Sequence, residues 1–210
     1  MIGYVVSSNW EYFRKTLPRL LSSMNRAGIP RDSIHVFVGR SPNIGNGTTM
    51  FARYHYLKWG AYEHTALIGY TEMPPRFTHV FLLHDTCEVG EQFPYRVAHG
   101  LQFASVDVVA VNNGMCGFSL YRDAYLRSRT EELHALKDCD KHTAMLHEGF
   151  LVRGKGQIAE YPGKPYEQLG MEDIYGTGTP RLKEYYPQVD MWKYKANYGN
   201  TQPKNYIEVL

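Results

Sequence analysis

The residues best suited to chemistry follow an apolar run at residues 80–83. They read His84-Asp85-Thr86-Cys87-Glu88. In open α/β sheets, ligands bind beyond the carboxyl ends of the strands. A carboxylate at that position can hold a divalent cation with help from an imidazole or a second acid, and hard oxygen ligands favour Mg²⁺ or Mn²⁺. The same residues also fit a solvated turn after a core strand, in which Asp85 bonds its own backbone.

Several alternating elements could position this segment. The β-branched run at residues 2–6 and the run at 34–38 predict two buried strands. A helix is predicted between them, because its apolar residues share one face: Phe13, Leu17, Leu20, Leu21 and Met24. A strand–helix–strand order favours a parallel pair with a right-handed crossover.

The middle of the chain continues the pattern. After a glycine-rich loop at residues 39–49, we expect a helix with Phe51, Tyr54, Leu57 and Ala61 on one stripe. Further strands are predicted at 66–70, 78–83 and 106–111, and a helix at 123–138. After residue 147 the apolar pattern weakens, which favours loops or a partly extended cover. The predicted fold is α/β, a mixed and mostly parallel Rossmann-like sheet flanked by helices, in one domain with a loop-rich C-terminal part.

Composition narrows the class of protein. A chain of 210 residues predicts one domain, and the charge balance of 23 − 21 = +2 predicts neither nucleic acid nor a membrane surface as partner. The three cysteines form no CxxC motif, which favours a reducing, cytoplasmic location. We expect no signal peptide and no membrane span. The chain contains no Walker A sequence and no GxSxG elbow.

Three segments carry a resemblance to a known family. They are Tyr4-Val5-Val6-Ser7-Ser8-Asn9, Asp85-Thr86-Cys87 and the stretch at residues 112–122. With them the sequence resembles the nucleotide-sugar glycosyltransferases of GT-A fold. More narrowly, it is similar to the N-terminal glycosyltransferase domains of large multidomain chlorella-virus proteins. The resemblance implies one GT-A domain over residues 1–210, and it leaves room for further domains in a longer chain. Residues 1–122 would bind nucleotide and metal, and residues 123–210 would form the acceptor side and C-terminal loops.

The resemblance also implies site residues. Those expected to bind the nucleotide sugar are Val6, Ser7, Ser8, Asn9, Arg40, Arg53 (on a helix), His84, Asp85, Thr86 and Asn113. Those expected to hold Mn²⁺ or Mg²⁺ are Asp85, Cys87 and His147. Cys87 stands where the family has a second Asp, and a thiol is a poor Mg²⁺ ligand. Asp85 could therefore bind the metal alone, or with Glu88 or His84, or the metal could be weakly held. Ser7 and Asn9 also fit helix caps.

Transfer of a sugar makes two further demands on the chain. The departing diphosphate needs positive charge, which basic residues of the C-terminal part could supply: Arg153, Lys155, Arg181, Lys193 and Lys195. Each of these also fits a solvated surface. The resemblance makes Glu172 and Asp173 the expected catalytic pair. An inverting enzyme would use such a carboxylate as general base on the acceptor, and a retaining enzyme could use the pair to hold sugar hydroxyls. The pair also fits the start of a helix.

The implied activity is metal-dependent transfer of a glucose- or rhamnose-type sugar from a UDP-sugar to a glycan or glycoprotein acceptor. The viral resemblance places it in capsid glycan synthesis, in the host cytoplasm. Two alternatives stay open at this point. One is a metal-dependent nucleotide phosphohydrolase, although few acids surround Asp85 for a two-metal site. The other is a noncatalytic nucleotide-sugar-binding module.

Overall fold

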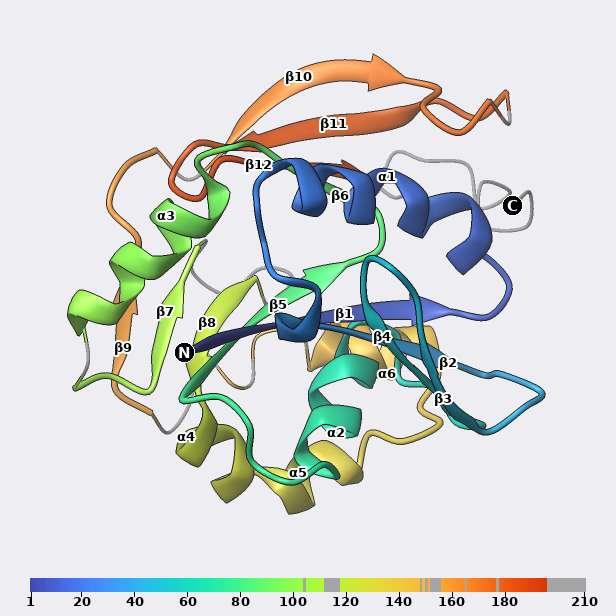
Figure 1. Cartoon of the computed structure of the whole chain (residues 1–210), viewed down its shortest axis with the longest axis vertical. Helices are drawn as coiled ribbons and strands as arrows, with labels where there is room; N and C mark the ends of the chain where they lie inside the picture. Colours follow the sequence, from blue (N-terminus) through green and yellow to red (C-terminus); the bar gives the residue numbers. More distant parts are fainter. Residues whose placement is uncertain are drawn as a thin grey trace.

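An eight-stranded mixed sheet forms the centre of the molecule (Figure 1). The computed structural model describes residues 1–103, 105–111, 118–147, 149, 151, 156–164, 166–176 and 178–195. In spatial order the strands are β3 (Gly45–Thr48), β4 (Arg53–Tyr56), β2 (Ile34–Gly39), β1 (Ile2–Asn9), β5 (His79–His84), β8 (Ser119–Arg122), β7 (Val108–Ala110) and β9 (Ile158–Glu160). β1 pairs in parallel with both β2 and β5, so the predicted parallel strand–helix–strand unit is confirmed.

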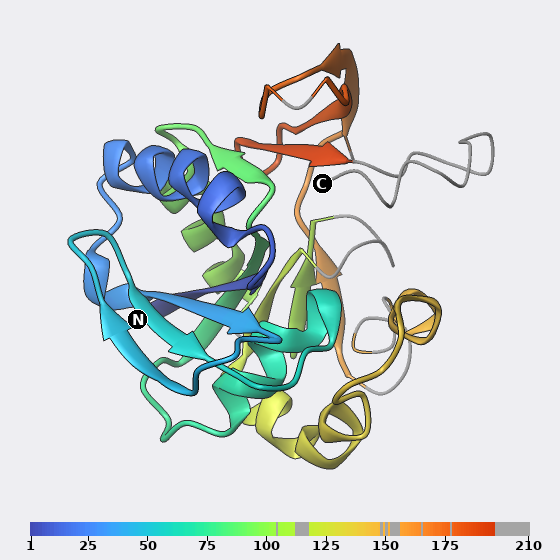
Figure 2. The same cartoon turned by 90° about the vertical axis from the view of Figure 1, so that its right-hand side faces the viewer.

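Helices cover both faces of this sheet (Figures 1 and 2). One face carries α1 (Phe13–Arg26) and α3 (Phe93–His99), and the opposite face carries α2 (Thr65–Thr71), α4 (Asp123–Ser128) and α5 (Thr130–His134). Tyr4 and Val6 of β1 belong to the core on the α1 side, and Val5 belongs to the core on the α2 side. Because both faces are buried, the central strands read as continuous apolar runs. The short elements are α6 (Lys141–Leu146), η1 (Arg31–Ser33), η2 (Tyr62–His64) and η3 (Gly100–Phe103).

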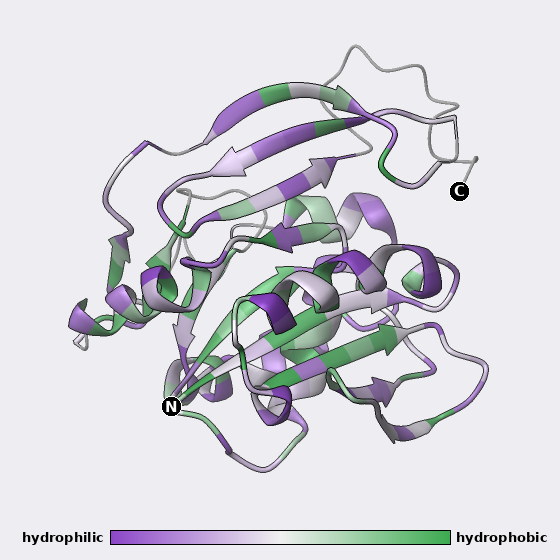
Figure 3. Ribbon diagram, turned by 45° about the horizontal axis from the view of Figure 1, so that its top comes forward, coloured by the Kyte–Doolittle hydropathy of each residue, from purple (hydrophilic) through white to green (hydrophobic). Residues whose placement is uncertain are grey.

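A second, antiparallel sheet lies on the same side as α1. Its order is β10 (Glu167–Glu172), β11 (Arg181–Tyr186), β12 (Met191–Lys195) and β6 (Cys87–Val89). The expected loop-rich C-terminal part therefore contains three strands of this sheet. Several of its buried positions are polar or charged, among them Arg181, Glu184 and Lys193, so the hydropathy of the sequence does not alternate cleanly. Figure 3 shows hydrophilic stretches on β10 and β11, whereas the central strands are largely hydrophobic.

Two predictions in the middle of the chain are wrong. The helix expected around Tyr54 is strand β4, which pairs with β2 and β3, and Arg53 therefore lies on a strand. The strand expected at residues 66–70 is helix α2. All seven residues of α2 are buried. A short apolar run that is buried all round has no periodicity to distinguish a helix from a strand.

The single helix expected at residues 123–138 is two short helices, α4 and α5. Among the described residues, none of the helices is both long enough and apolar enough to cross a membrane.

Candidate active site

A cavity of about 440 Å³ lies where β1, β2 and β5 end and the second sheet begins. Its position beyond the carboxyl ends of parallel strands is where open α/β sheets bind ligands. The residues that line it are Ser7, Ser8, Asn9, Tyr12, Thr16, Gly39, Arg40, Gly60, Tyr62, Glu63, Thr65, His84, Asp85, Thr86, Lys141, Met145, Arg181, Lys193, Tyr194 and Lys195.

Asp85 lies directly after β5, and its carboxylate is held by two elements. Its Oδ2 accepts hydrogen bonds from Ser8 Oγ of β1 at 2.6 Å and from Thr16 Oγ1 of α1 at 2.7 Å. Its backbone N–H donates to Ser7 O, which extends the β1–β5 ladder by one residue. The carboxylate therefore bonds neighbouring elements, and the alternative of a solvated turn that bonds its own backbone is not what the structure contains. Oδ1 accepts no hydrogen bond from the described residues and remains available to a ligand.

Lys193 of β12 reaches the same end of β5. Its Nζ donates to His84 Nδ1 at 3.0 Å and to Thr86 Oγ1, and only 7% of the residue is exposed. Burial, and then the charge of Lys193, lowers the pKa of His84 well below its ordinary value. His84 is therefore neutral and accepts through Nδ1, which leaves the proton on Nε2. Within the described residues, that buried Nε2 has no hydrogen-bond partner.

Arg181, at the start of β11, is 3% exposed and lines the cavity. Its guanidinium carbon lies 5.3 Å from the centre of the Tyr175 ring. Among the described residues, Nε and Nη2 have no hydrogen-bond partner. Burial lowers the pKa of Arg181, although a guanidinium still keeps its charge in proteins.

The charged side chains around the cavity are mostly positive. Five cationic residues line its described wall, against the two acids Glu63 and Asp85. The cations are Arg40, Lys141, Arg181, Lys193 and Lys195. Lys195 is paired with Glu184 at 2.8 Å, and burial lowers the pKa of Lys141. This wall favours a ligand that carries negative charge.

The structure brings most of the predicted nucleotide-sugar residues together. Seven of them line the cavity: Ser7, Ser8, Asn9, Arg40, His84, Asp85 and Thr86. Ser7 Oγ also has a structural task, since it donates to Glu63 O at 2.7 Å and accepts from the Ala66 N–H at 3.0 Å. Arg40 adopts a φ of 55° and lies 5.0 Å from the centre of the Tyr62 ring.

Other predicted residues lie apart from the cavity lining. Val6 is wholly buried in the core on the α1 side. Arg53 forms an ion pair with Asp32 at 2.9 Å. Asn113, together with Arg153 and Lys155, lies outside the described residues.

The predicted catalytic pair is at the end of β10 and just after it. Glu172 is paired with Lys183 of β11 at 3.1 Å, and Asp173 Oδ2 accepts from the Gly178 N–H at 2.7 Å. Neither belongs to the described lining of the cavity. Asp173 acts on the cavity indirectly, because its charge favours the protonated form of Arg181. The catalytic role of the pair stays a prediction.

The predicted metal ligands are separated in the structure. Cys87 is 1% exposed within the apolar core, and His147 ends α6 with its Nδ1 2.8 Å from Thr143 O. In the described part of the chain, no three His, Cys, Asp or Glu side chains form a group that could hold a metal ion. Of the three predicted ligands, Asp85 alone belongs to the described cavity lining, where Glu63 is the other carboxylate. Mn²⁺ or Mg²⁺ bound to Asp85 would depend on phosphate oxygens and water for its other ligands.

Sequence reasoning missed several lining residues: Tyr12, Thr16, Tyr62, Glu63, Thr65, Lys141, Met145 and Tyr194. One of these residues, Thr16, could have been found from the sequence. Thr16 interrupts the apolar face of α1 three residues after Phe13 and is nevertheless buried. A buried hydroxyl on such a face needs a polar partner, which is Asp85 here.

Comparisons with known proteins give the fold. No protein-family model and no curated protein matches the sequence. The structure is similar to that of S. aureus TarS residues 1–349, with a TM-score of 0.52 and 11% identity over 77% of this chain. A second TarS structure, in complex with UDP-GlcNAc, matches with a TM-score of 0.45 and 10% identity over 77% of this chain and 59% of that one. The chain spans 58% of the length of TarS 1–349. The chain therefore shares a Rossmann-like α/β fold with TarS.

Proposed function

We propose that this protein is a glycosyltransferase that takes a sugar from a nucleotide-sugar donor. The observation that carries the proposal is the Asp85 carboxylate, fixed by Ser8 and Thr16 in a cavity whose charged wall is otherwise mostly cationic. A nucleotide sugar matches both features, because its diphosphate is anionic and its hydroxyl groups and any phosphate-bound cation can contact a carboxylate. The fold agrees with this assignment.

The donor we propose is a UDP-sugar of the glucose or rhamnose type. The resemblance of the sequence supports UDP, and TarS itself has been crystallised with UDP and with UDP-GlcNAc. Tyr12 and Tyr62 line the cavity, and aromatic rings of this kind can stack on a pyrimidine. A glycan or glycoprotein acceptor, and a role in a viral capsid glycan, rest on the sequence resemblance alone.

The chemistry divides between the two ends of the donor. Positive charge develops on the sugar ring as its anomeric C–O bond breaks, and negative charge develops on the departing diphosphate. Mn²⁺ or Mg²⁺, if bound to Asp85 and the donor phosphates, would offset that negative charge. Asp85 holds its orientation through Ser8 and Thr16, so it needs no reorganisation when the donor binds. Glu172 and Asp173 remain the proposed carboxylates for the acceptor side.

A donor screen tests the proposal. UDP-, GDP- and dTDP-sugars, including UDP-glucose, UDP-rhamnose and UDP-GlcNAc, are incubated with the protein with and without Mn²⁺. We expect slow release of free sugar and UDP from a UDP-sugar, and a rise in the melting temperature (Tm) on addition of UDP. Asp85→Asn should lose most of this activity. Asp32→Asn is the matched control, since Asp32 pairs with Arg53 away from the cavity lining.

The same screen separates the other functions. A phosphohydrolase would cleave simple nucleotides to phosphate or a nucleoside monophosphate with no dependence on the sugar. A binding module would show the Tm shift without any turnover of donor. Either result would contradict the proposed transferase.

A further inference from the structure

The part of the cavity around Arg181, Lys193 and His84 contains more buried hydrogen-bond donors than acceptors. Arg181 Nε and Nη2 and His84 Nε2 are buried nitrogens without a hydrogen-bond partner among the described residues. Because the Lys193 ammonium can only donate to His84 Nδ1, the proton of that imidazole lies on Nε2, and all three nitrogens are N–H donors. Leaving a buried donor unpaired costs free energy. The missing partner must therefore be a group that brings acceptor oxygens.

The two cations, Arg181 and Lys193, also have no direct ion pair. Lys193 donates to His84 and Thr86, and neither cation forms an ion pair with a described residue, although the charges of Asp85 and Asp173 favour the protonated form of Arg181. Both are more than nine-tenths buried and both line the cavity. A buried cation without a compensating charge is unfavourable, and cations in such positions are normally paired. The ligand that completes this site must be an anion with several oxygens.

The two cations come from the sheet opposite Asp85. Arg181 begins β11 and Lys193 lies within β12, whereas Asp85 follows β5 of the main sheet. Lys193 contacts His84 and Thr86, the two neighbours of Asp85 in the chain, so the cations and the carboxylate share one end of the cavity. A ligand that reaches both sheets needs an anionic part next to a part that can meet a carboxylate.

We propose that Arg181 and Lys193 bind the diphosphate of the donor and stabilise it as the leaving group, a role that needs no divalent cation. This inference rests on the proposed glycosyltransferase function. In the reaction, the bond between the anomeric carbon and the β-phosphate oxygen breaks, and its electron pair stays on that oxygen. The acceptor hydroxyl oxygen forms the new bond to the anomeric carbon, and its proton passes to a base. The negative charge left on the β-phosphate is then held by two cations of this chain.

The test compares UDP with uridine as probes, by calorimetry in the presence of EDTA. Wild-type protein should bind UDP much more tightly than uridine without a metal. Arg181→Met and Lys193→Met should each weaken UDP about tenfold to hundredfold and leave uridine binding unchanged. Lys183→Met is the matched control. Lys183 lies on β11 beside Arg181, but it is paired with Glu172 and does not line the described cavity wall.

Two measurements guard against a purely structural effect. Arg181→Met should change the Tm of the free protein little, because Nε and Nη2 have no described partner and the contact with the Tyr175 ring is a weak one to lose. Arg181→Lys should retain part of the preference for UDP over uridine, since it keeps the charge and loses the planar fork.

The outcomes distinguish the inference from the function on which it rests. Equal binding of UDP and uridine by wild-type protein in EDTA would overturn the inference, as would a UDP preference that both Met variants retain. UDP binding that appears only when Mn²⁺ is added would overturn it too. If neither probe binds with or without Mn²⁺, the proposed function itself fails.

Discussion

Asp85 is oriented by hydroxyl groups that lie 77 and 69 residues away in the chain. Ser8 comes from the neighbouring strand and Thr16 from the first turns of α1. The position of Asp85 and Ser8 follows from the sequence, because both stand where an apolar strand ends. Thr16 does not follow in the same way, since only the packing of α1 on the sheet brings its hydroxyl to the carboxylate.

Thr16→Val tests this orientation at the scale of one atom group. Valine keeps the shape of the side chain and removes the donor to Asp85 Oδ2. We expect the turnover of the nucleotide sugar to fall about tenfold, because one hydrogen bond to a charged group is lost. The measurement is the rate of UDP release from the best donor.

Two variants control for a loss of folding. Thr16→Ser restores the hydroxyl and should recover most of the rate, which a change of packing alone would not. Thr71→Val removes another buried helical hydroxyl, which bonds Ile68 O and does not line the cavity, and it should leave turnover unchanged. Equal rates for wild type and Thr16→Val would refute the positioning role.

At the scale of the elements, two imidazoles and an amide form a hydrogen-bonded chain across three adjacent strands. His35 of β2 and His55 of β4 lie 3.0 Å apart between Nδ1 and Nε2, and His55 Nδ1 lies 2.8 Å from Asn46 Oδ1 of β3. If the amide oxygen accepts from His55 Nδ1, then His55 Nε2 accepts from His35 Nδ1. Burial, together with the nearby charges of Arg53 and Arg76 and, for His35, that of His55, lowers the pKa of both histidines to about 4.

This pair predicts a loss of stability in acid. Unfolded histidine has a pKa near 6.5, so between about pH 6.5 and pH 4 the unfolded chain binds more protons than the folded one. The free energy of unfolding should therefore fall as the pH is lowered through that range. The measurement is urea unfolding at pH 7 and pH 5. The free energy of unfolding should fall less between these two values in His55→Gln than in wild type. His142→Gln, at an exposed position, should leave the pH dependence as in wild type. An unchanged slope in His55→Gln would contradict the assignment.

The elements also show where sequence reasoning reached its limit. The strands β1, β2 and β5 follow from their apolar runs, and so does the site at their ends. Helix α2 was not predictable, because a helix buried on every side carries no amphipathic period. The second sheet was not predictable either, and the sequence did not distinguish Arg181 and Lys193 from the other three basic residues that could bind the diphosphate. Only the pairing of β12 with β6, across about 100 residues, places Lys193 beside His84.

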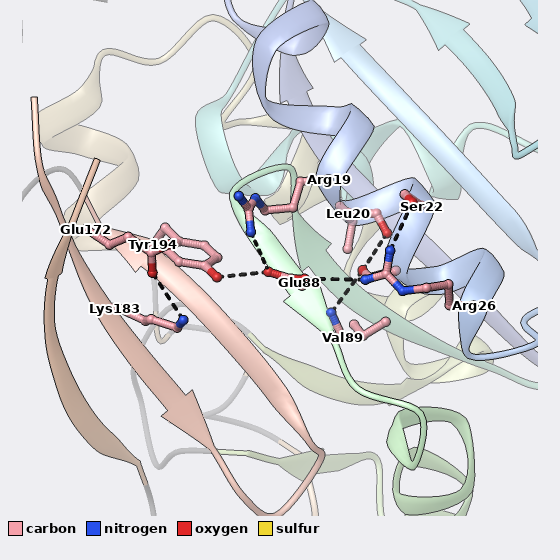
Figure 4. A network of polar contacts seen from close by, with 10 residues as sticks. Arg19, Leu20, Ser22, Arg26, Glu88, Val89, Glu172, Lys183 and Tyr194 are labelled. Carbon is pink, nitrogen blue, oxygen red and sulfur yellow. Dashed lines mark hydrogen bonds and ion pairs between the residues drawn. The ribbon is translucent and has the colours of Figure 1, made fainter. Parts of the chain in front are cut away.

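At the scale of the whole molecule, Glu88 connects the second sheet to α1 (Figure 4). It lies on β6, and its carboxylate contacts Arg19 at 3.0 Å and Arg26 at 3.5 Å, both from α1. Tyr194 of β12 donates to it at 2.9 Å. Since β6 follows directly after Asp85 and Thr86, this network fixes the second sheet at the end of the cavity that carries Lys193.

Glu88→Gln tests how much this network contributes. The amide keeps the size of the side chain and removes the charge shared by two arginines and a tyrosine, so we expect the free energy of unfolding to fall by about 1–2 kcal/mol. The loss should be smaller at high salt, because the arginines are partly exposed. Glu91→Gln, at an exposed position nearby, should be neutral. If Glu88→Gln matches wild type at low salt, the second sheet is held on α1 by apolar contacts such as those of Val89 and Met191, and the cavity owes its shape to packing rather than charge.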